Sequence, residues 1–312
     1  MSSRSIALRL GASVLALLCN LPAPAQTAYR YRDANGHWVF TDSAPPTAAK
    51  QDSFSLNHHS ETLQNTIERT DSGSSTRFTA INTCLCVATF LEKIVRSDDP
   101  AIPNGAEYRK ILQPQSRELM IRVENAGAGT SSLQYMWTIA LGSPDAKHQP
   151  PGPYRAPFAI GSSYVISQAY PSTFTHNTPD SRYAVDIALP DGTPVYAARE
   201  GIVINVRHDA FRGGAVPAMV DQANVVEILH DDGTIAMYAH LHWDSIRVHI
   251  GEHVGRGEYL ANSGSTGFST GPHLHFAVIR NADFTSISVP IEFAGPAGIR
   301  IIPTTQQLLT AY

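Results

Sequence analysis

The sequence predicts a mostly β protein whose carboxy-terminal half is an antiparallel sheet domain. Short runs rich in β-branched and aromatic residues recur along the chain, separated by glycine, proline and asparagine. No long stretch has the 3.6-residue spacing of apolar residues that marks an amphipathic helix. The chain has 312 residues, 43% of them hydrophobic and 16% charged, which is enough for two or three small domains with apolar cores.

Residues 1–25 are expected to be a secretory signal peptide. Arg4 and Arg9 precede an apolar run over 10–18, and small residues at 23–25 offer a cleavage point. The loss of two arginines and no acids would move the formal net charge from -4 to -6. An acidic chain has no general attraction to nucleic acid, and no other run is long enough to span a membrane. We therefore expect the mature chain in the periplasm or outside the cell.

The next two segments differ in composition. Residues 26–42 are expected to form a β-hairpin, because aromatic-rich runs at 29–32 and 37–41 flank an Asp-Ala-Asn-Gly turn. This hairpin resembles a short, uncharacterised module at the amino-termini of bacterial envelope proteins. Residues 43–76 are rich in Ser, Thr, Ala, Gln and Pro, which predicts a linker with one helical turn around 63–68.

Residues 77–151 are predicted to form a small β-sandwich-like domain. Its strand-like runs are 78–90, 118–123 and 132–141. Cys84 and Cys86 would be neighbours on one face of a strand, and a disulfide between them would close too small a loop to add much stability by chain entropy. Both a disulfide and a pair of buried thiols remain open.

Residues 154–295 are predicted to be a second antiparallel sheet domain, followed by a tail over 296–312. Asp231-Asp232-Gly233 provides a tight hairpin turn between two of the strands. The strand-like runs are 193–198, 201–206, 224–230 and 234–241. The domain boundary falls in a Pro-Pro-Gly-Pro segment at 150–153.

Histidines in this last domain follow a strand pattern. His273 and His275 enter an apolar run two residues apart, so on a strand both rings project from one face. One ring could then bind a metal while the other lies near the metal's open coordination position. Two surface histidines would give the same spacing, so the pattern alone leaves both interpretations open.

Two further polar positions lie in apolar surroundings. Asp186 interrupts the run 183–190, where a carboxylate is costly to bury unless it is paired or bound to a metal. His240 lies in the alternating stretch 238–242, which would also suit a half-buried edge strand. His176 lies ten positions before Asp186 in a polar loop.

Three ordered blocks, 186–195, 238–241 and 264–276, resemble the lysostaphin-type zinc metallopeptidases, and the similarity runs from about Tyr164 to Ile291. The resemblance implies an antiparallel β peptidase domain with an open, barrel-like groove lined by glycines. It also implies a hydrolase that acts on the peptides of bacterial peptidoglycan.

The resemblance further implies one Zn²⁺ per chain, held by His176, Asp186 and His275 with water in the fourth position. His240 and His273 would be catalytic. A three-ligand zinc lowers the pKa of its water to about 7, and a neighbouring imidazole can accept a proton from that water.

One departure from the family pattern concerns the ligand aspartate. The usual pattern places three residues between the first histidine and the aspartate, whereas nine separate His176 from Asp186. Asp180 has the shorter spacing and is a rival ligand. We prefer Asp186 because only this residue is followed by the family's Ile-Ala-x-Pro-x-Gly-Thr-Pro block.

Two other functions remain open at this point. A non-catalytic relative could bind peptidoglycan or activate another hydrolase, although all five site positions are filled here. An extracellular protease of Gly-rich proteins could use the same site. Metal content separates the first of these from an enzyme, and product analysis separates the second.

Overall fold

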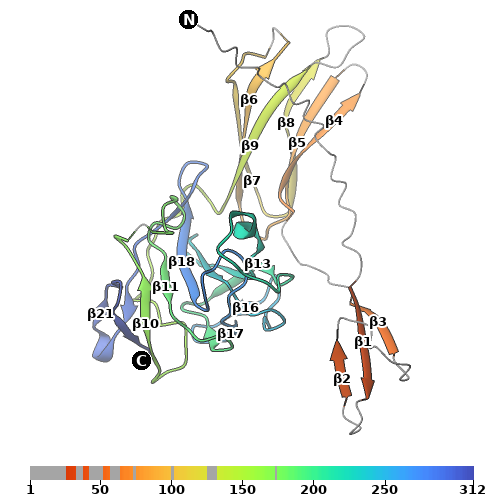
Figure 1. The fold of residues 1–312 in the computed structure, drawn as a ribbon. Helices are drawn as coiled ribbons and strands as arrows, with labels where there is room; N and C mark the ends of the chain where they lie inside the picture. The colour runs from red at the N-terminus through yellow and green to blue at the C-terminus, as the bar shows by residue number, and fades with distance from the viewer. Residues whose placement is uncertain are drawn as a thin grey trace, which may run out of the picture. The chain divides into compact units, whose positions relative to one another are not determined.

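The computed structural model (Figure 1) divides into two compact units, residues 1–59 and residues 60–312. It describes residues 26–32, 38–41, 52–56, 64–72, 75–99, 102–124, 132–172 and 174–312. The first unit contains a three-stranded antiparallel sheet of order β2-β1-β3, formed by Gln26–Arg32 (β1), Trp38–Thr41 (β2) and Asp52–Leu56 (β3). The expected pairing of the hairpin strands is confirmed. Its turn and the predicted signal peptide lie outside the described residues.

The middle of the chain is a β-sandwich of two three-stranded antiparallel sheets. One has the order β4-β5-β8 and the other β7-β6-β9. Fully buried Phe78 and Phe90 come from different sheets and share one apolar core. The strands are Thr66–Ser72 (β4), Ser75–Asn82 (β5), Ala88–Ser97 (β6), Glu107–Leu112 (β7), Ser116–Glu124 (β8) and Leu133–Leu141 (β9).

The prediction of a linker over residues 43–76 is wrong in two places, because β3 and β4 lie within it. The expected helical turn around 63–68 is also wrong, since strand β4 begins at Thr66. Ile67 is the one buried residue of β4, so the sequence of this edge strand shows almost no alternation of apolar and polar residues. Its backbone pairing with β5 determines its structure instead.

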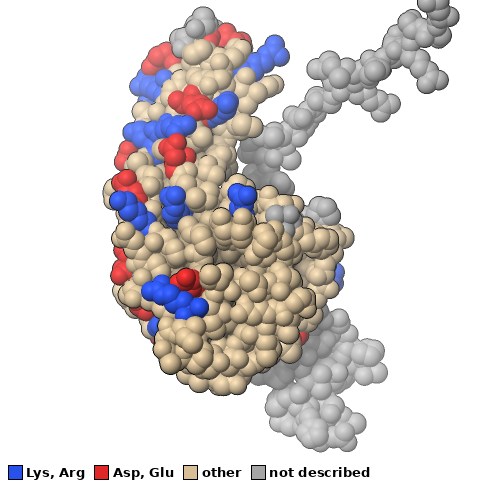
Figure 2. All heavy atoms as spheres, turned by 90° about the vertical axis from the view of Figure 1, so that its left-hand side faces the viewer, with Lys and Arg blue, Asp and Glu red and all other residues tan. Residues whose placement is uncertain are grey.

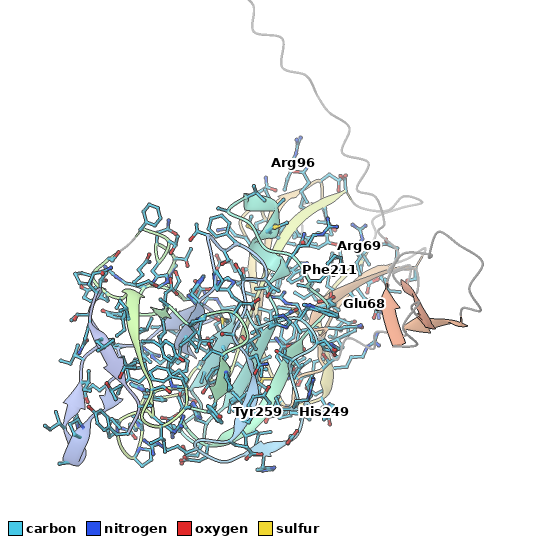
Figure 3. All side chains as sticks on the ribbon, turned by 60° about the horizontal axis from the view of Figure 1, so that its bottom comes forward. Glu68, Arg69, Arg96, Phe211, His249 and Tyr259 are labelled. Atoms are coloured by element: carbon cyan, nitrogen blue, oxygen red, sulfur yellow. A yellow bond between two sulfur atoms is a disulfide. The ribbon has the colours of Figure 1, made fainter. Side chains whose placement is uncertain are left out.

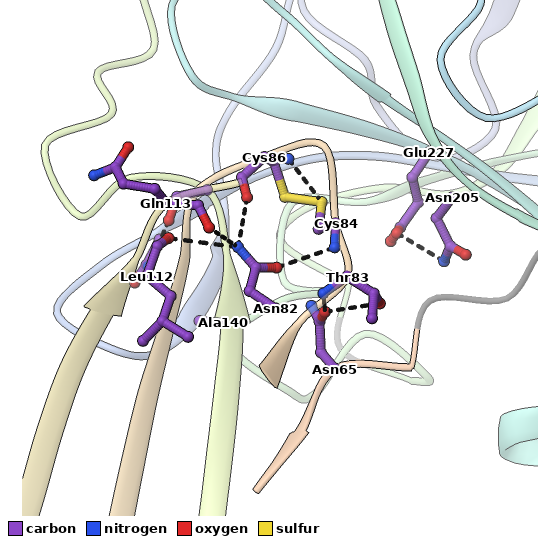
Figure 4. Close-up of a disulfide and its surroundings, with 12 residues drawn as sticks. Asn65, Asn82, Thr83, Cys84, Cys86, Leu112, Gln113, Ala140, Asn205 and Glu227 are labelled. Carbon is purple, nitrogen blue, oxygen red and sulfur yellow. Dashed lines mark hydrogen bonds between the residues drawn. A yellow bond between two sulfur atoms is a disulfide. The ribbon is translucent and has the colours of Figure 1, made fainter. Parts of the chain in front are cut away.

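The run 78–90 is two strands joined by a turn, and a disulfide between Cys84 and Cys86 lies in that turn (Figure 4). Asn82 organises the turn: its Oδ1 accepts from the Cys84 backbone N–H at 3.0 Å, and its Nδ2 donates to the Cys86 carbonyl at 2.9 Å. The same amide donates to the Gln113 carbonyl at 2.8 Å. Asn82 thereby satisfies backbone groups that a continuous strand would have paired.

The carboxy-terminal domain is built on a nine-stranded antiparallel sheet, as the mostly β prediction requires. Its strand order is β16-β13-β14-β15-β18-β11-β10-β22, with β19 paired to β18. The strands are Ser163–Gln168 (β10), Val185–Ile187 (β11), Gly201–Arg207 (β13), Val225–Leu229 (β14), Ile235–Ala239 (β15), His253–Val254 (β16), Leu274–Asn281 (β18), Ser286–Ser288 (β19) and Leu308–Thr310 (β22).

Two small pairs flank this sheet, β12 (Pro194–Tyr196) with β17 (Tyr259–Asn262) and β20 (Phe293–Ala294) with β21 (Arg300–Ile301). Among the described residues the helical segments are short 3₁₀ turns at Pro217–Gln222 and Pro296–Gly298. In the described part of the chain, no helix is long and apolar enough to cross a membrane.

The expectation of a tail over 296–312 is also corrected. β22 pairs with β10 in the main sheet, and Leu309 and Ala311 are buried in its core. The strand spans three residues, too few for alternation to distinguish it from a loop.

The sandwich packs on the carboxy-terminal domain through both apolar and polar contacts. The disulfide turn shares an apolar cluster with Ile235 and Ile279 of the main sheet. Beside this cluster, the buried Asn281 donates to Thr89 Oγ1 at 2.8 Å and to the Gly142 carbonyl at 2.9 Å. These contacts join the two domains within the unit that begins at residue 60.

Charged side chains are unevenly distributed over this unit. On the face drawn in Figure 2 they gather over the sandwich, while the carboxy-terminal domain is largely uncharged there. Several of them pair with one another, as Arg117 does with Glu68 and Arg69 with Asp71 at 3.1 Å; Glu68 and Arg69 adjoin on β4 (Figure 3). Such exposed pairs contribute little to stability.

Candidate metal centre

Three side chains converge on one face of the main sheet. Asp186 in β11 and His275 in β18 are direct cross-strand partners. Their side chains meet as well, since His275 Nδ1 lies 2.9 Å from Asp186 Oδ1. His176 joins them from the loop before β11, with Nε2 3.1 Å from Asp186 Oδ2. One ligand atom from each residue lies within 4.8 Å of the other two.

The state of His176 favours a metal at this point. Its ring is buried, with 3% of the side chain exposed. Within the described part of the chain its Nδ1 has no hydrogen-bond partner, and its Nε2 approaches Asp186 Oδ2 at 3.1 Å without the geometry of a hydrogen bond. Buried polar atoms without partners are costly, so an imidazole in this state indicates a missing ligand.

The donor set fits zinc. Two imidazoles and one carboxylate are a usual protein ligand set for catalytic zinc, which keeps a further position open for water. Ligand atoms about 2.0–2.1 Å from a tetrahedral zinc are roughly 3.4 Å apart. The separations of 2.9 and 3.1 Å around Asp186 approach that spacing.

The electrostatics of Asp186 suit an anionic ligand. Burial alone would raise the pKa of this carboxyl, but the neighbouring His176 and His275 rings lower it far below its usual range. Asp180, the rival ligand, is exposed and lies outside the cluster. The geometry thus favours Asp186. Of the nine intervening residues, 177–184 form the loop and turn that lead into β11, and Val185 is the first residue of that strand.

His240 lies beside this cluster, but the predicted strand over 234–241 ends one residue before it, at Ala239. Its backbone has a φ of 62°, in the left-handed region. His240 Nδ1 lies 2.7 Å from the Thr266 carbonyl oxygen, and a carbonyl can only accept, so Nδ1 carries the proton. Burial, helped by the nearby His273 and His275 rings, lowers the pKa of His240 to about 3.

His273 completes the group just before β18. Its Nδ1 lies 2.8 Å from the Gly271 carbonyl and 3.3 Å from Ser269 Oγ. Its Nε2 lies 3.9 Å from Asp186 Oδ1 and so faces the cluster. The rings of His240 and His273 are 4.6 Å apart, centre to centre.

The five residues named from the sequence therefore come together, three as a possible ligand set and two as adjacent imidazoles. The Nδ1 atoms of His240 and His273 each contact a backbone carbonyl, so in the neutral ring Nδ1 donates and Nε2 is the acceptor. Sequence patterns did not indicate the residues that hold His240, among them Thr266 and Asn224. Their contacts join distant segments and have no local signature.

Most of this site lies in a part of the chain that matches the model of a known protein family. Residues 180–286 match the model of "Peptidase family M23", a span that includes Asp186, His240, His273 and His275 and begins after His176. Residues 14–64 match a "Domain of unknown function (DUF4124)".

The curated relatives include the peptidoglycan DD-endopeptidase ShyA of Vibrio cholerae, 34% identical over 130 residues, which are 41% of this chain and 26% of that protein. Lysostaphin of Staphylococcus simulans is 31% identical over 128 residues, 39% of this chain and 24% of the relative. This chain thus spans about a quarter of the length of these relatives. Among solved structures, the catalytic domain of lysostaphin from Staphylococcus simulans has a TM-score of 0.28 and 27% identity, covering 38% of this chain and 80% of that chain.

Proposed function

Residues 180–286 form a domain of peptidase family M23, and from this premise we propose that the chain is a zinc-dependent endopeptidase that cuts peptide bonds in bacterial peptidoglycan. The observation that carries the proposal is the convergence of His176, Asp186 and His275 beside the rings of His240 and His273. A structural cluster of satisfied histidines would not leave Nδ1 of the buried His176 ring without a partner in the described part of the chain.

His176, Asp186 and His275 would hold the metal. Zinc bound there supplies Lewis acidity and lowers the pKa of a bound water to about 7. Asp186 contributes the negative charge of the ligand set, since its low pKa keeps it ionised at neutral pH. Its cross-strand pairing with His275 fixes two of the three ligands on rigid strands.

The other two imidazoles would move the proton and stabilise the developing charge. His240, held through Nδ1 by the Thr266 carbonyl, presents Nε2 as an acceptor, so it can hydrogen-bond the attacking water and pass its proton on to the leaving amine. His273, anchored through Nδ1, presents Nε2 toward the cluster and can hydrogen-bond the oxyanion when that nitrogen is protonated.

Peptidoglycan is the proposed substrate because relatives with this domain are named for it. They include peptidoglycan DD-endopeptidases and a glycyl-glycine endopeptidase of Staphylococcus capitis. The proposal includes a periplasmic or secreted location after removal of residues 1–25. Sequencing the amino-terminus of the mature protein tests that part, with a new terminus at Gln26 expected.

Incubating the zinc-loaded full chain with purified peptidoglycan tests the activity. We expect cross-linked peptides to be cut to smaller fragments with new amino groups, identified by mass, and no glycan cleavage. Asp186→Ala is the matched control. A Gly-rich polypeptide tested in parallel identifies a general extracellular protease if it is cut faster than peptidoglycan. Binding of peptidoglycan by the zinc-loaded chain without any new amino groups would support the non-catalytic alternative.

A further inference from the structure

We propose that Thr266 and Asn224 are positioning residues that fix the ring of His240 for catalysis by holding four separate chain segments together. The inference rests on the proposed function, and it assigns a role to side chains that do not belong to the ligand set or to the imidazole pair. Both residues are buried, and Asn224 has no exposed surface at all.

Thr266 contacts His240 and its surroundings on two sides. Its backbone carbonyl accepts from His240 Nδ1 at 2.7 Å. Its hydroxyl donates to the carbonyl of Leu241, the residue after His240, at 2.8 Å. The same hydroxyl accepts from the Asn224 backbone N–H at 3.0 Å. Thr266, whose carbonyl orients the His240 ring, is therefore also hydrogen-bonded to the backbone next to His240.

Asn224 extends the network to a fourth segment, the loop that contains Ala210. Its Nδ2 donates to the Leu241 carbonyl at 3.2 Å and to the Ala210 carbonyl at 2.7 Å. Its Oδ1 accepts from the Ala210 backbone N–H at 2.9 Å. Ala210 precedes Phe211, whose side chain is labelled in Figure 3 and is 59% exposed. One buried amide thus joins this loop to the segment that carries His240.

Close backbone packing holds the segments together as well. A Cβ placed on Gly267 would lie only 2.6 Å from the Ala223 backbone nitrogen, so the segment after Thr266 lies directly against the segment before Asn224. Glycine permits this approach and the φ of 77° that accompanies it. A side-chain hydroxyl at 266 is thereby kept within reach of both of its partners.

The conformation of His240 explains why such a network is needed. A non-glycine residue in the left-handed region costs roughly 1 kcal/mol or more and persists only where its surroundings hold it. β15 ends at Ala239, so no sheet partner fixes the backbone of His240. On the carboxy-terminal side, the backbone N–H of Leu241 donates to the Asn224 carbonyl at 3.2 Å. The Thr266 hydroxyl and the Asn224 amide add to this restraint by donating to the Leu241 carbonyl.

The test compares Thr266→Val, which removes the hydroxyl at nearly constant volume, with Thr266→Ser, which keeps it. Both are made in the zinc-loaded full chain and assayed on a soluble cross-linked muropeptide. For the Val variant we expect kcat to fall roughly 10- to 100-fold, as for other small misplacements of catalytic groups, with KM and zinc content near wild type. The Ser variant is expected to recover most of kcat. Equal losses in both variants, or no loss in either, would overturn the proposal.

A second readout does not depend on activity. In the ¹⁵N spectrum of histidine-labelled protein, His240 of the wild type is expected to carry its proton on Nδ1, and Thr266→Val is expected to show a mixture of tautomers. A wild-type His240 protonated on Nε2 would overturn the proposal even if the variants fail to fold. A wild type that has the expected tautomer but does not hydrolyse peptidoglycan would contradict the proposed function and leave the positioning network intact.

Discussion

The two ends of one face of the main sheet differ sharply. Alternation along β18 places His275 and Ile279 on the same face. At one end His275 meets Asp186 across the strand pair and lies next to the other imidazoles. At the other end Ile279 pairs across the sheet with Ile235, and the Cys84–Cys86 turn of the sandwich covers both.

One face of the sheet thus carries a polar site beside an apolar surface that another domain covers. At the site end, backbone carbonyls and buried amides of the surrounding loops hold the side chains. At the covered end, the apolar side chains are buried by a neighbouring domain. Changes at the first end should therefore alter metal binding and turnover, whereas changes at the second should alter stability.

The largest effect is expected from the ligand aspartate. Asp186→Ala removes the carboxylate of the cluster, which is the hydrogen-bond partner of His275 and lies 3.1 Å from His176, so zinc and activity should both be lost. Asp180→Ala should leave both nearly unchanged because that side chain is exposed and outside the cluster. Metal analysis and hydrolysis assays check the pair. The reverse pattern would make Asp180 the ligand.

The histidines should separate into two classes. His176→Ala and His275→Ala remove a ligand, so zinc affinity and activity are expected to fall together. His240→Ala and His273→Ala should keep zinc and lose roughly 10²–10⁴-fold in turnover. Zinc content, folding and hydrolysis are to be measured in one buffer. Loss of zinc from His273→Ala together with its retention by His275→Ala would show that these two roles are exchanged.

A smaller effect, on stability, is expected from Glu92 in the sandwich. This carboxyl is fully buried, with Tyr108 and Trp137 as cross-strand neighbours, and within the described residues neither of its oxygens has a hydrogen-bond partner. Burial raises its pKa from 4.5 to about 7. The folded state therefore holds this proton more tightly than the unfolded state does. The resulting stability is present below pH 4.5 and is lost as the pH rises through 7.

Glu92→Gln removes this dependence. Between pH 4.5 and 8 the wild type should lose roughly 3 kcal/mol of unfolding free energy more than the variant does. Urea denaturation at both pH values measures the difference, and groups that titrate in both proteins cancel. The same pH dependence in the two proteins would mean that Glu92 reaches water or a partner.

The smallest effect on activity is expected from the disulfide. Cys84→Ser with Cys86→Ser places two hydroxyls in the apolar cluster at the covered end, which should cost about 1–3 kcal/mol per unsatisfied hydroxyl. Replacing both by Ala separates the loss of the bond from the added polarity. Turnover per folded molecule should stay at the wild-type value in both. A loss of turnover with an unchanged melting transition would show that the two ends are coupled.

The five site residues could be named from the sequence because three ordered blocks resemble a known family, whereas residue spacing alone left His240, His273 and His275 open to other interpretations. The spacing of His273 and His275 and the carboxylate of Asp186 in an apolar run both pointed to this face. The conformation of His240 could not be predicted, since the alternating pattern continues past Ala239 while the strand does not. The restraint there comes from segments far away in the chain.

The fold was predictable to a similar degree. Strands such as β5, β13, β14 and β15 were predicted, whereas β3, β4, β7, β10 and β22 were among those missed. In β4 and β22 few residues are buried, so hydrophobic periodicity carries little information about them. The turn that contains the disulfide could not be predicted, because it lies within a continuous run of β-forming residues. The hydrogen bonds of Asn82 that stabilise the turn have no signature in the sequence.

Metal content of the purified wild-type chain tests the central claim most directly. After dialysis against metal-free buffer, elemental analysis should find about one zinc per chain, held by His176, Asp186 and His275. Strong chelation should remove both the zinc and the hydrolysis of peptidoglycan, and added zinc should restore both. Zinc near zero, with none taken up on addition, would contradict the account of this site.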